Sequence, residues 1–133
     1  MPARSAAAQL LHGVLHDGTM ISELIDAKDG PLKDLPPSAR ARAQSLALST
    51  LRNLAPLDIV LDQFLNKSPP LKVRNALRLA ANEMLVDGVA PHAAVDAAVR
   101  LVRESRKLQH LSGLTNAVAR RVAEHGPEIW ADM

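Results

Sequence analysis

The sequence predicts an all-α protein, a bundle of about seven helices joined by short loops. Apolar residues recur at intervals of three and four along the 133 residues, and no long stretch alternates apolar with polar side chains as a half-buried strand does. Aromatic residues make up only 2 % of the chain although 47 % of it is hydrophobic, so the core must be aliphatic. Small aliphatic side chains suit closely packed helices better than a pleated sheet.

The amino-terminal quarter contains two predicted helices. The first spans residues 3–16 and buries a stripe of alanine and leucine. It should end before Gly18, because glycine readily adopts the left-handed conformation that closes a helix. A short helix with an apolar face follows, formed around Ile21, Leu24 and Ile25.

Prolines and a glycine separate the helices in the middle of the chain. Residues 29–37 contain three prolines and one glycine and are predicted to form a loop. Ser38 follows this loop and is placed to cap a helix that runs to Arg52. The next helix spans roughly residues 56–65, where apolar side chains form a stripe.

Three longer helices complete the predicted bundle. The first covers residues 70–86, with Pro70 suited to the first helical position. The second covers residues 91–107 and is apolar over more than half of its circumference, which predicts a central position with neighbours on several sides. The last covers residues 112–125, after which Gly126 and Pro127 indicate a turn.

The predicted helix 91–107 has one polar side. Its polar residues are spaced by four, three and four and therefore share one ridge: Asp96, Arg100, Arg103 and Lys107. This ridge is either a solvated face with helical ion pairs or a surface that faces phosphates. The net charge is only +2, yet residues 100–121 hold six cations and one acid, so the charge is locally concentrated.

The composition excludes several classes of function. The chain has no cysteine, which rules out disulfides, thiolate metal sites and thiol nucleophiles and suits a reducing cytoplasm. No apolar run reaches the ~18 residues of a membrane span, and we expect a cytoplasmic protein without membrane contacts.

His12 and His16 have the spacing of a metal-binding pair, but no third ligand is evident and we expect no metal. His92 follows a proline at a helix start and is interpreted as structural.

Several stretches together resemble a known family. "PHAAVDAAV" and "LSGLTNAVARRV" are similar to the signature of the NusB family of RNA-binding transcription antitermination proteins. More closely, they resemble the NusB-like amino-terminal domain of Sun/RsmB-type ribosomal RNA cytosine-5 methyltransferases. Upstream, "ARSAAAQLLHGVLHDG", "SLALSTLRNLAPLDIVLDQFL" and "VRNALRLAANEML" match the family's earlier helices in order and spacing. The likeness covers residues 3–125, with Ala119 in place of the usual leucine.

The resemblance implies a NusB-like domain over residues 1–126, with residues 127–133 as the start of a linker to a methyltransferase domain. This domain would bind ribosomal RNA and position it for an S-adenosylmethionine-dependent catalytic domain. The chain itself has neither the nucleophilic cysteine of those enzymes nor a glycine-rich cofactor turn, so we expect no catalysis and no cofactor in it. The expected partners are ribosomal RNA and the methyltransferase domain, not DNA. Two alternatives stay open: a stand-alone antitermination factor that binds RNA with a ribosomal protein, and a helical module that docks on its own catalytic domain.

The resemblance also implies where RNA is bound. In the family, RNA contacts lie on the first helix, on the loop and helix after the third, and on the last helix. The matching residues in this chain are Arg4, Lys72, Arg74, Arg78, Asn116, Arg120 and Arg121. Residues spaced by four share a helix side, as Arg74 and Arg78 do, and also Asn116 and Arg120. Because aromatic residues for base stacking are scarce, we expect weak binding.

Overall fold

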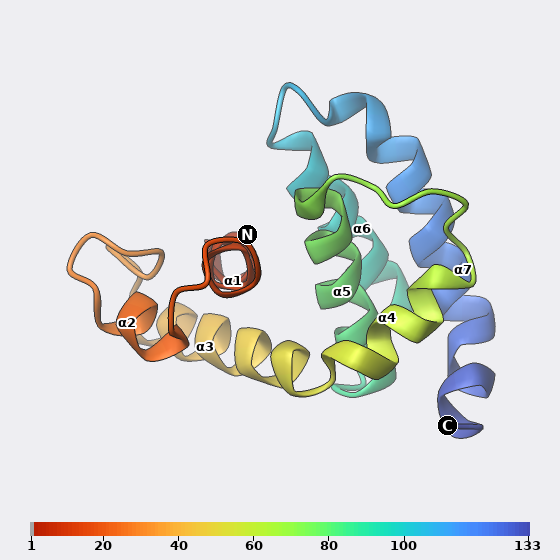
Figure 1. The fold of residues 1–133 in the computed structure, drawn as a ribbon, viewed down its shortest axis with the longest axis horizontal. Helices are drawn as coiled ribbons and strands as arrows, with labels where there is room; N and C mark the ends of the chain where they lie inside the picture. Colours follow the sequence, from red (N-terminus) through yellow and green to blue (C-terminus); the bar gives the residue numbers. More distant parts are fainter. Residues whose placement is uncertain (1) are drawn as a thin grey trace.

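The computed structural model describes residues 2–133, and in that range the chain folds into seven α-helices and one short 3₁₀-helix (Figure 1). In chain order these elements are α1 (Pro2–Leu15), α2 (Ile21–Asp26), α3 (Pro37–Arg52), α4 (Leu54–Asp62), α5 (Leu71–Leu85), α6 (Pro91–Arg103), η1 (Gln109–Leu111) and α7 (Ser112–Ala131). No strand occurs among the described residues, so the all-α prediction is confirmed. None of these helices is long and apolar enough to span a bilayer.

The core consists of two apolar clusters that meet at α5. The larger cluster lies among α4, α5, α6 and α7 and includes Leu61, Leu77 and Val122. The smaller cluster joins α1 and α3, and Leu79 of α5 completes it together with Leu32 of the loop before α3. Figure 1 shows the same division, with α1 to α3 on one side and α4 to α7 on the other. Helix α5 therefore holds the two halves of the molecule together.

Helix α5, rather than α6, is the most central element. All residues from 75 to 83 are buried, and α5 packs against α1, α3, α4, α6 and α7. Helix α6 packs mainly on α5 and α7 through small side chains such as Ala94 and Ala98. The prediction that α6 is central is thus confirmed only on the sides that contact α5 and α7. Its opposite side is open, and Asp96, Arg100 and Arg103 are exposed there as predicted.

Helix α6 ends at Arg103, four residues earlier than the sequence predicts. The backbone carbonyl of Arg103 accepts a hydrogen bond of 3.3 Å from Nε2 of Gln109, which satisfies one of the free carbonyls at the helix end. The carboxylate of Glu104 accepts a hydrogen bond of 2.8 Å from Oγ of Ser5 in α1. Lys107 consequently lies in the following turn and does not belong to the helical ridge.

Helix α7 continues through Gly126 and Pro127 to Ala131, so the predicted turn at these residues is wrong. A Cβ atom on Gly126 would lie 3.2 Å from side-chain carbons of Leu85 and Val122, which makes glycine the residue that lets α7 approach the end of α5. Beyond it, Trp130 packs partly buried against the larger cluster. The predicted division of the chain at residue 126 stays a prediction.

Other helix boundaries follow the sequence with small shifts. Gly18 has the predicted left-handed conformation, with φ of 69°. Helix α3 begins at Pro37, and Pro36 precedes it without a side-chain cap, so the prediction that Ser38 caps this helix is wrong. Proline suits the first helical position because its missing N–H needs no partner there. Helix α4 starts at Leu54, two residues earlier than predicted, and ends at Asp62 instead of residue 65.

Candidate nucleic-acid interface

Arg4, the first predicted contact residue, is held by a carboxylate of α5. Its Nη2 atom lies 2.8 Å from Oε2 of Glu83, and its Nε atom lies 3.1 Å from both carboxylate oxygens. The side chain of Glu83 is only 7 % exposed and that of Arg4 is 21 % exposed. A carboxylate this deep is costly without a cation. Arg4 therefore joins α1 to α5, and its charge is matched inside the fold.

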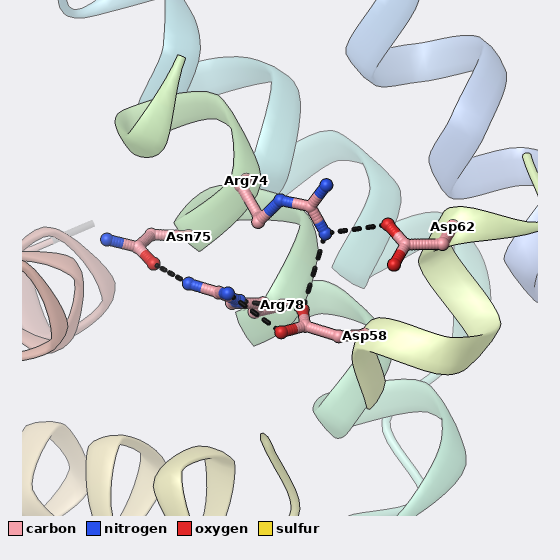
Figure 2. Close-up of polar contacts among 5 residues, drawn as sticks. All are labelled: Asp58, Asp62, Arg74, Asn75 and Arg78. Atoms are coloured by element: carbon pink, nitrogen blue, oxygen red, sulfur yellow. Dashed lines mark hydrogen bonds and ion pairs between the residues drawn. The ribbon is translucent and has the colours of Figure 1, made fainter. Parts of the chain in front are cut away.

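Figure 2 shows Arg74 and Arg78 of α5 converging on carboxylates of α4. Arg78 donates to both oxygens of Asp58, each at 2.8 Å, from Nε and from Nη2. Nη1 of Arg74 lies 2.9 Å from Oδ1 of Asp62 and 3.5 Å from Oδ1 of Asp58. The spacing of four does place both guanidinium groups on one side of α5, but that side faces α4.

These two arginines are therefore structural ion-pair partners. Two positive charges meet two negative charges, and the side chains of Arg74 and Arg78 are only 13 % and 10 % exposed. Turning Arg78 toward a phosphate would leave Asp58 without its main partner, and turning Arg74 away would remove the cation beside Asp62. Sequence reasoning missed the partners, although Asp58 and Asp62 are also spaced by four and so match the arginine pair.

Lys72 and Arg121 lie at two further places. Lys72 is exposed at the start of α5, beside a pocket between α1, α5 and the end of α6. The guanidinium carbon of Arg121 lies 5.4 Å from the ring centroid of Phe64, a cation–π distance. Arg120 precedes Arg121 on the helix but lines a different surface. The seven predicted residues thus do not form one surface.

Asn116 and Arg120 line a groove between α6 and α7 with a volume of about 890 Å³. Helix α6 contributes Arg103 and His92 to the same groove, and Val99 provides part of its apolar wall. We call this site the α6–α7 groove. In the sequence the ridge of α6 and the cations of α7 are separate sets, whereas in the structure Arg103 and Arg120 line the same groove. This arrangement depends on how the two helices pack, and no spacing in the sequence encodes it.

The arginines of the groove are available to a ligand. Within residues 2–133, neither Arg103 nor Arg120 has a carboxylate within ion-pair distance, and both are exposed. Two carboxylates also line the groove. Oδ2 of Asp96 lies 3.0 Å from Nε of Arg100 on its own helix, and Oε2 of Glu124 lies 3.8 Å from Nε2 of His125. The exposed pair of Asp96 and Arg100 is the solvated ion pair that one reading of the ridge predicts. Two unpaired guanidinium groups and the amide of Asn116 can bind phosphate and hydrogen-bond a neighbouring sugar or base.

The structure adds a third group to the histidine pair of α1. Ligand atoms of His12, His16 and Asp17 lie within 4.8 Å of one another, and Asp17 is the donor that sequence reasoning missed. In a tetrahedral site with bonds of ~2.1 Å the ligand atoms lie about 3.4 Å apart, so these side chains would have to draw closer around an ion. The two rings also stack, with centroids 4.8 Å apart. The absence of a metal from this chain stays a prediction.

Comparison with known proteins gives a consistent picture of the fold. The NusB family model matches residues 1–124 of the chain. Among solved structures, the chain is similar to T. maritima NusB, with a TM-score of 0.74 and 18 % sequence identity over 98 % of this chain and 95 % of that one. At this identity the likeness shows a shared fold. No curated protein matches the chain.

Proposed function

The chain belongs to the NusB family, and from this premise we propose that it binds single-stranded ribosomal RNA through the α6–α7 groove. The observation that carries the proposal is that Arg103 and Arg120 line one groove and that neither has a carboxylate within ion-pair distance among the described residues. Asn116 lies in the same groove and supplies an amide that can donate and accept hydrogen bonds. The bound phosphates would be held by the arginines, and the amide would contact a base or a ribose.

We further propose that this chain acts as the RNA-binding accessory domain of a ribosomal RNA cytosine-5 methyltransferase. The support is the likeness of "LRNLAPLD", residues 51–58, and of the later helices to the amino-terminal domain of those enzymes. In this role the chain positions RNA, while S-adenosylmethionine and the nucleophilic cysteine belong to a separate catalytic domain. Arg4, Arg74 and Arg78 then act by holding the helices in place, since each is paired with a carboxylate.

The family match is equally compatible with a stand-alone transcription antitermination factor. The NusB family model matches residues 1–124, and this match does not distinguish between the two roles. Such a factor would bind a short RNA element together with a small ribosomal protein. The two roles differ in the partner. A ribosomal protein that increases RNA affinity favours the antitermination role, whereas stable association with a separately expressed methyltransferase domain favours the accessory role.

Ultraviolet cross-linking to a ribosomal RNA fragment, followed by mass spectrometry, tests where RNA binds. We expect cross-linked peptides from residues 91–103 of α6 and 112–124 of α7, which line the groove. Peptides from α3 serve as the internal control, because this helix lies on the other side of the molecule (Figure 1). Cross-links confined to α3, or a complete lack of binding at low salt, would contradict the proposal.

A further inference from the structure

A pocket of about 640 Å³ lies between α1, the start of α5 and the end of α6. This volume falls within the range of ~300–1,000 Å³ that is usual for sites that enclose a small organic group. Ser5, Gln9 and His12 line it from α1, and Lys72 and Asn75 line it from α5. We call it the α1–α5 pocket. It is separate from the α6–α7 groove, which shares none of these residues.

Asn75 lines this pocket, and its side-chain nitrogen is a buried hydrogen-bond donor. Its side-chain oxygen accepts a hydrogen bond of 3.0 Å from Nη1 of Arg78. Because a guanidinium group can only donate, the oxygen of the amide must face Arg78 and the nitrogen must face away. Figure 2 shows this nitrogen pointing toward α1. Asn75 is 1 % exposed, and its Nδ2 atom has no hydrogen-bond partner among the described residues.

Arg78 is itself fixed, so the direction of the amide is built into the fold. Both oxygens of Asp58 accept from Arg78 at 2.8 Å. The chain of contacts from Asp58 through Arg78 to Asn75 thus holds the two N–H groups of the amide toward α1. A buried donor without an acceptor is destabilising, because it has lost its hydrogen bonds to water. The nitrogen has almost no exposed surface, so a small opening of the pocket wall would let the acceptor atom of a ligand reach it and remove that cost.

A second unpartnered atom and the walls of the pocket define the chemistry of the ligand. His12 has a buried Nδ1 atom without a partner, which can donate or accept according to its tautomer. Leu24 and Leu101 provide apolar walls. The carboxylates of Asp17 and Glu104 also line the pocket, so an anion is disfavoured inside it. A neutral, flat group with donors and acceptors on its edge fits these conditions, and a nucleobase is such a group.

The pocket and the α6–α7 groove lie on either side of the end of α6. Arg103 lines the groove, and the next two residues, Glu104 and Ser105, line the pocket. Lys72 is exposed beside the pocket and can neutralise a phosphate next to an inserted base. An RNA strand held by the groove can therefore reach the pocket by crossing the end of α6.

We propose that the α1–α5 pocket receives one unstacked nucleobase of the bound single-stranded RNA and that the amide of Asn75 donates to its edge. This inference rests on the proposed RNA-binding function and assigns a residue outside the groove. It also gives Arg78 a role as a positioning residue, because its contact orients the amide. Enclosure of the base between leucine walls supplies part of the contact area that aromatic stacking supplies in other proteins.

The test uses the full chain labelled with ¹⁵N and the single-stranded hexanucleotides of adenosine, cytidine and uridine. Nuclear magnetic resonance should show the side-chain NH₂ signals of Asn75 shifting on titration with at least one of them. The variant Asn75→Asp keeps an oxygen for Arg78 and removes the N–H groups, and we expect it to weaken RNA binding by about tenfold or more. Asn66→Asp introduces the same charge at an exposed position and is the matched control.

The outcomes separate this inference from the proposed function. If RNA binds while the Asn75 signals stay in place and both variants bind alike, the nucleobase pocket is wrong and RNA binding elsewhere stands. If no hexanucleotide and no ribosomal RNA fragment binds the wild-type chain, the proposed function fails and this inference fails with it. The NH₂ shifts are recorded on the wild-type chain, so the result does not depend on whether Asn75→Asp folds.

Discussion

Arg78 donates a hydrogen bond of 3.0 Å to the side-chain oxygen of Asn75, and this contact decides which way a buried amide faces. The same guanidinium group makes two bonds of 2.8 Å to Asp58. One arginine thus fastens α4 to α5 and also directs a polar group toward α1. The family resemblance implies that Arg78 contacts RNA, and the structure shows that its guanidinium group joins α4 to α5.

Replacing Arg78 with alanine should lower the free energy of unfolding by about 3 kcal/mol, at the lower end of the range for broken buried pairs. The side chain of Asp58 is 26 % exposed, so water can partly solvate the carboxylate that remains. Chemical denaturation measures the change. Arg100→Ala is the control, because it breaks an exposed pair with Asp96 and should cost less than about 1 kcal/mol. Equal losses in the two variants would contradict the structural role of Arg78.

Enlarging the small residues of α6 should overpack the core. Ala97 and Ala98 are 3 % and 1 % exposed, and leucine at either position should cost ~1–3 kcal/mol. Thermal unfolding of each variant measures the effect. Ala117→Leu adds the same side chain at an exposed position of α7 and should leave the midpoint nearly unchanged. Variants of Ala97 and Ala98 that are as stable as the parent would show that α6 is not closely packed.

A test of the groove is the double change Arg103→Ala and Arg120→Ala. The chain should bind a ribosomal RNA fragment with micromolar or weaker affinity, since few phosphates are neutralised. Loss of two phosphate contacts should weaken binding and reduce the slope of log K against log salt by about 1.4, because each contact on a single strand contributes roughly 0.7. Fluorescence anisotropy at several salt concentrations measures both quantities.

The matched control for the groove is Arg42→Ala with Arg52→Ala, which removes two exposed cations of α3. It should leave the salt slope nearly unchanged. An equal effect of both double variants would mean that binding follows net charge and not the groove. If neither variant affects RNA but Arg103 is needed to associate with a separately expressed methyltransferase domain, the surface is a protein-docking site.

The pair of Arg4 with Glu83 should show measurable coupling in a double-mutant cycle. Arg4→Met leaves a carboxylate that is 7 % exposed without its cation, whereas Arg4→Met together with Glu83→Gln removes both charges. The double variant should therefore be more stable than the sum of the single effects predicts, by ~0.5–3 kcal/mol. Chemical denaturation of the four proteins gives this coupling energy. Strict additivity would show that the two residues act independently.

The chain alone should transfer no methyl group from S-adenosylmethionine to ribosomal RNA. It has no cysteine to attack the cytosine ring. Incorporation of a radiolabelled methyl group measures this, with a complete cytosine-5 methyltransferase as the positive control. Methylation that depends on the purified chain would overturn the accessory-domain proposal.

The sequence by itself determined the fold class and most of the helices. Apolar residues spaced by three and four share one side only in a helix, so their pattern predicts helices. The residues that start and end a helix act locally, so the starts of α6 and α7 and the left-handed conformation of Gly18 also follow from the sequence. Errors arose where a tertiary contact overrode a local signal. Gly126 indicated a turn, but in the fold it lets α7 approach Leu85 within a continuous helix.

Only the tertiary structure decided what the charged residues do. Spacing places two arginines on one side of a helix but does not tell whether that side meets water or another helix. Arg74 and Arg78 meet Asp62 and Asp58 of α4, while Arg120, equally basic in the sequence, joins Arg103 in an open groove. The physical reason is that burial and ion pairing depend on which helices pack together, and that packing brings together residues far apart in the chain.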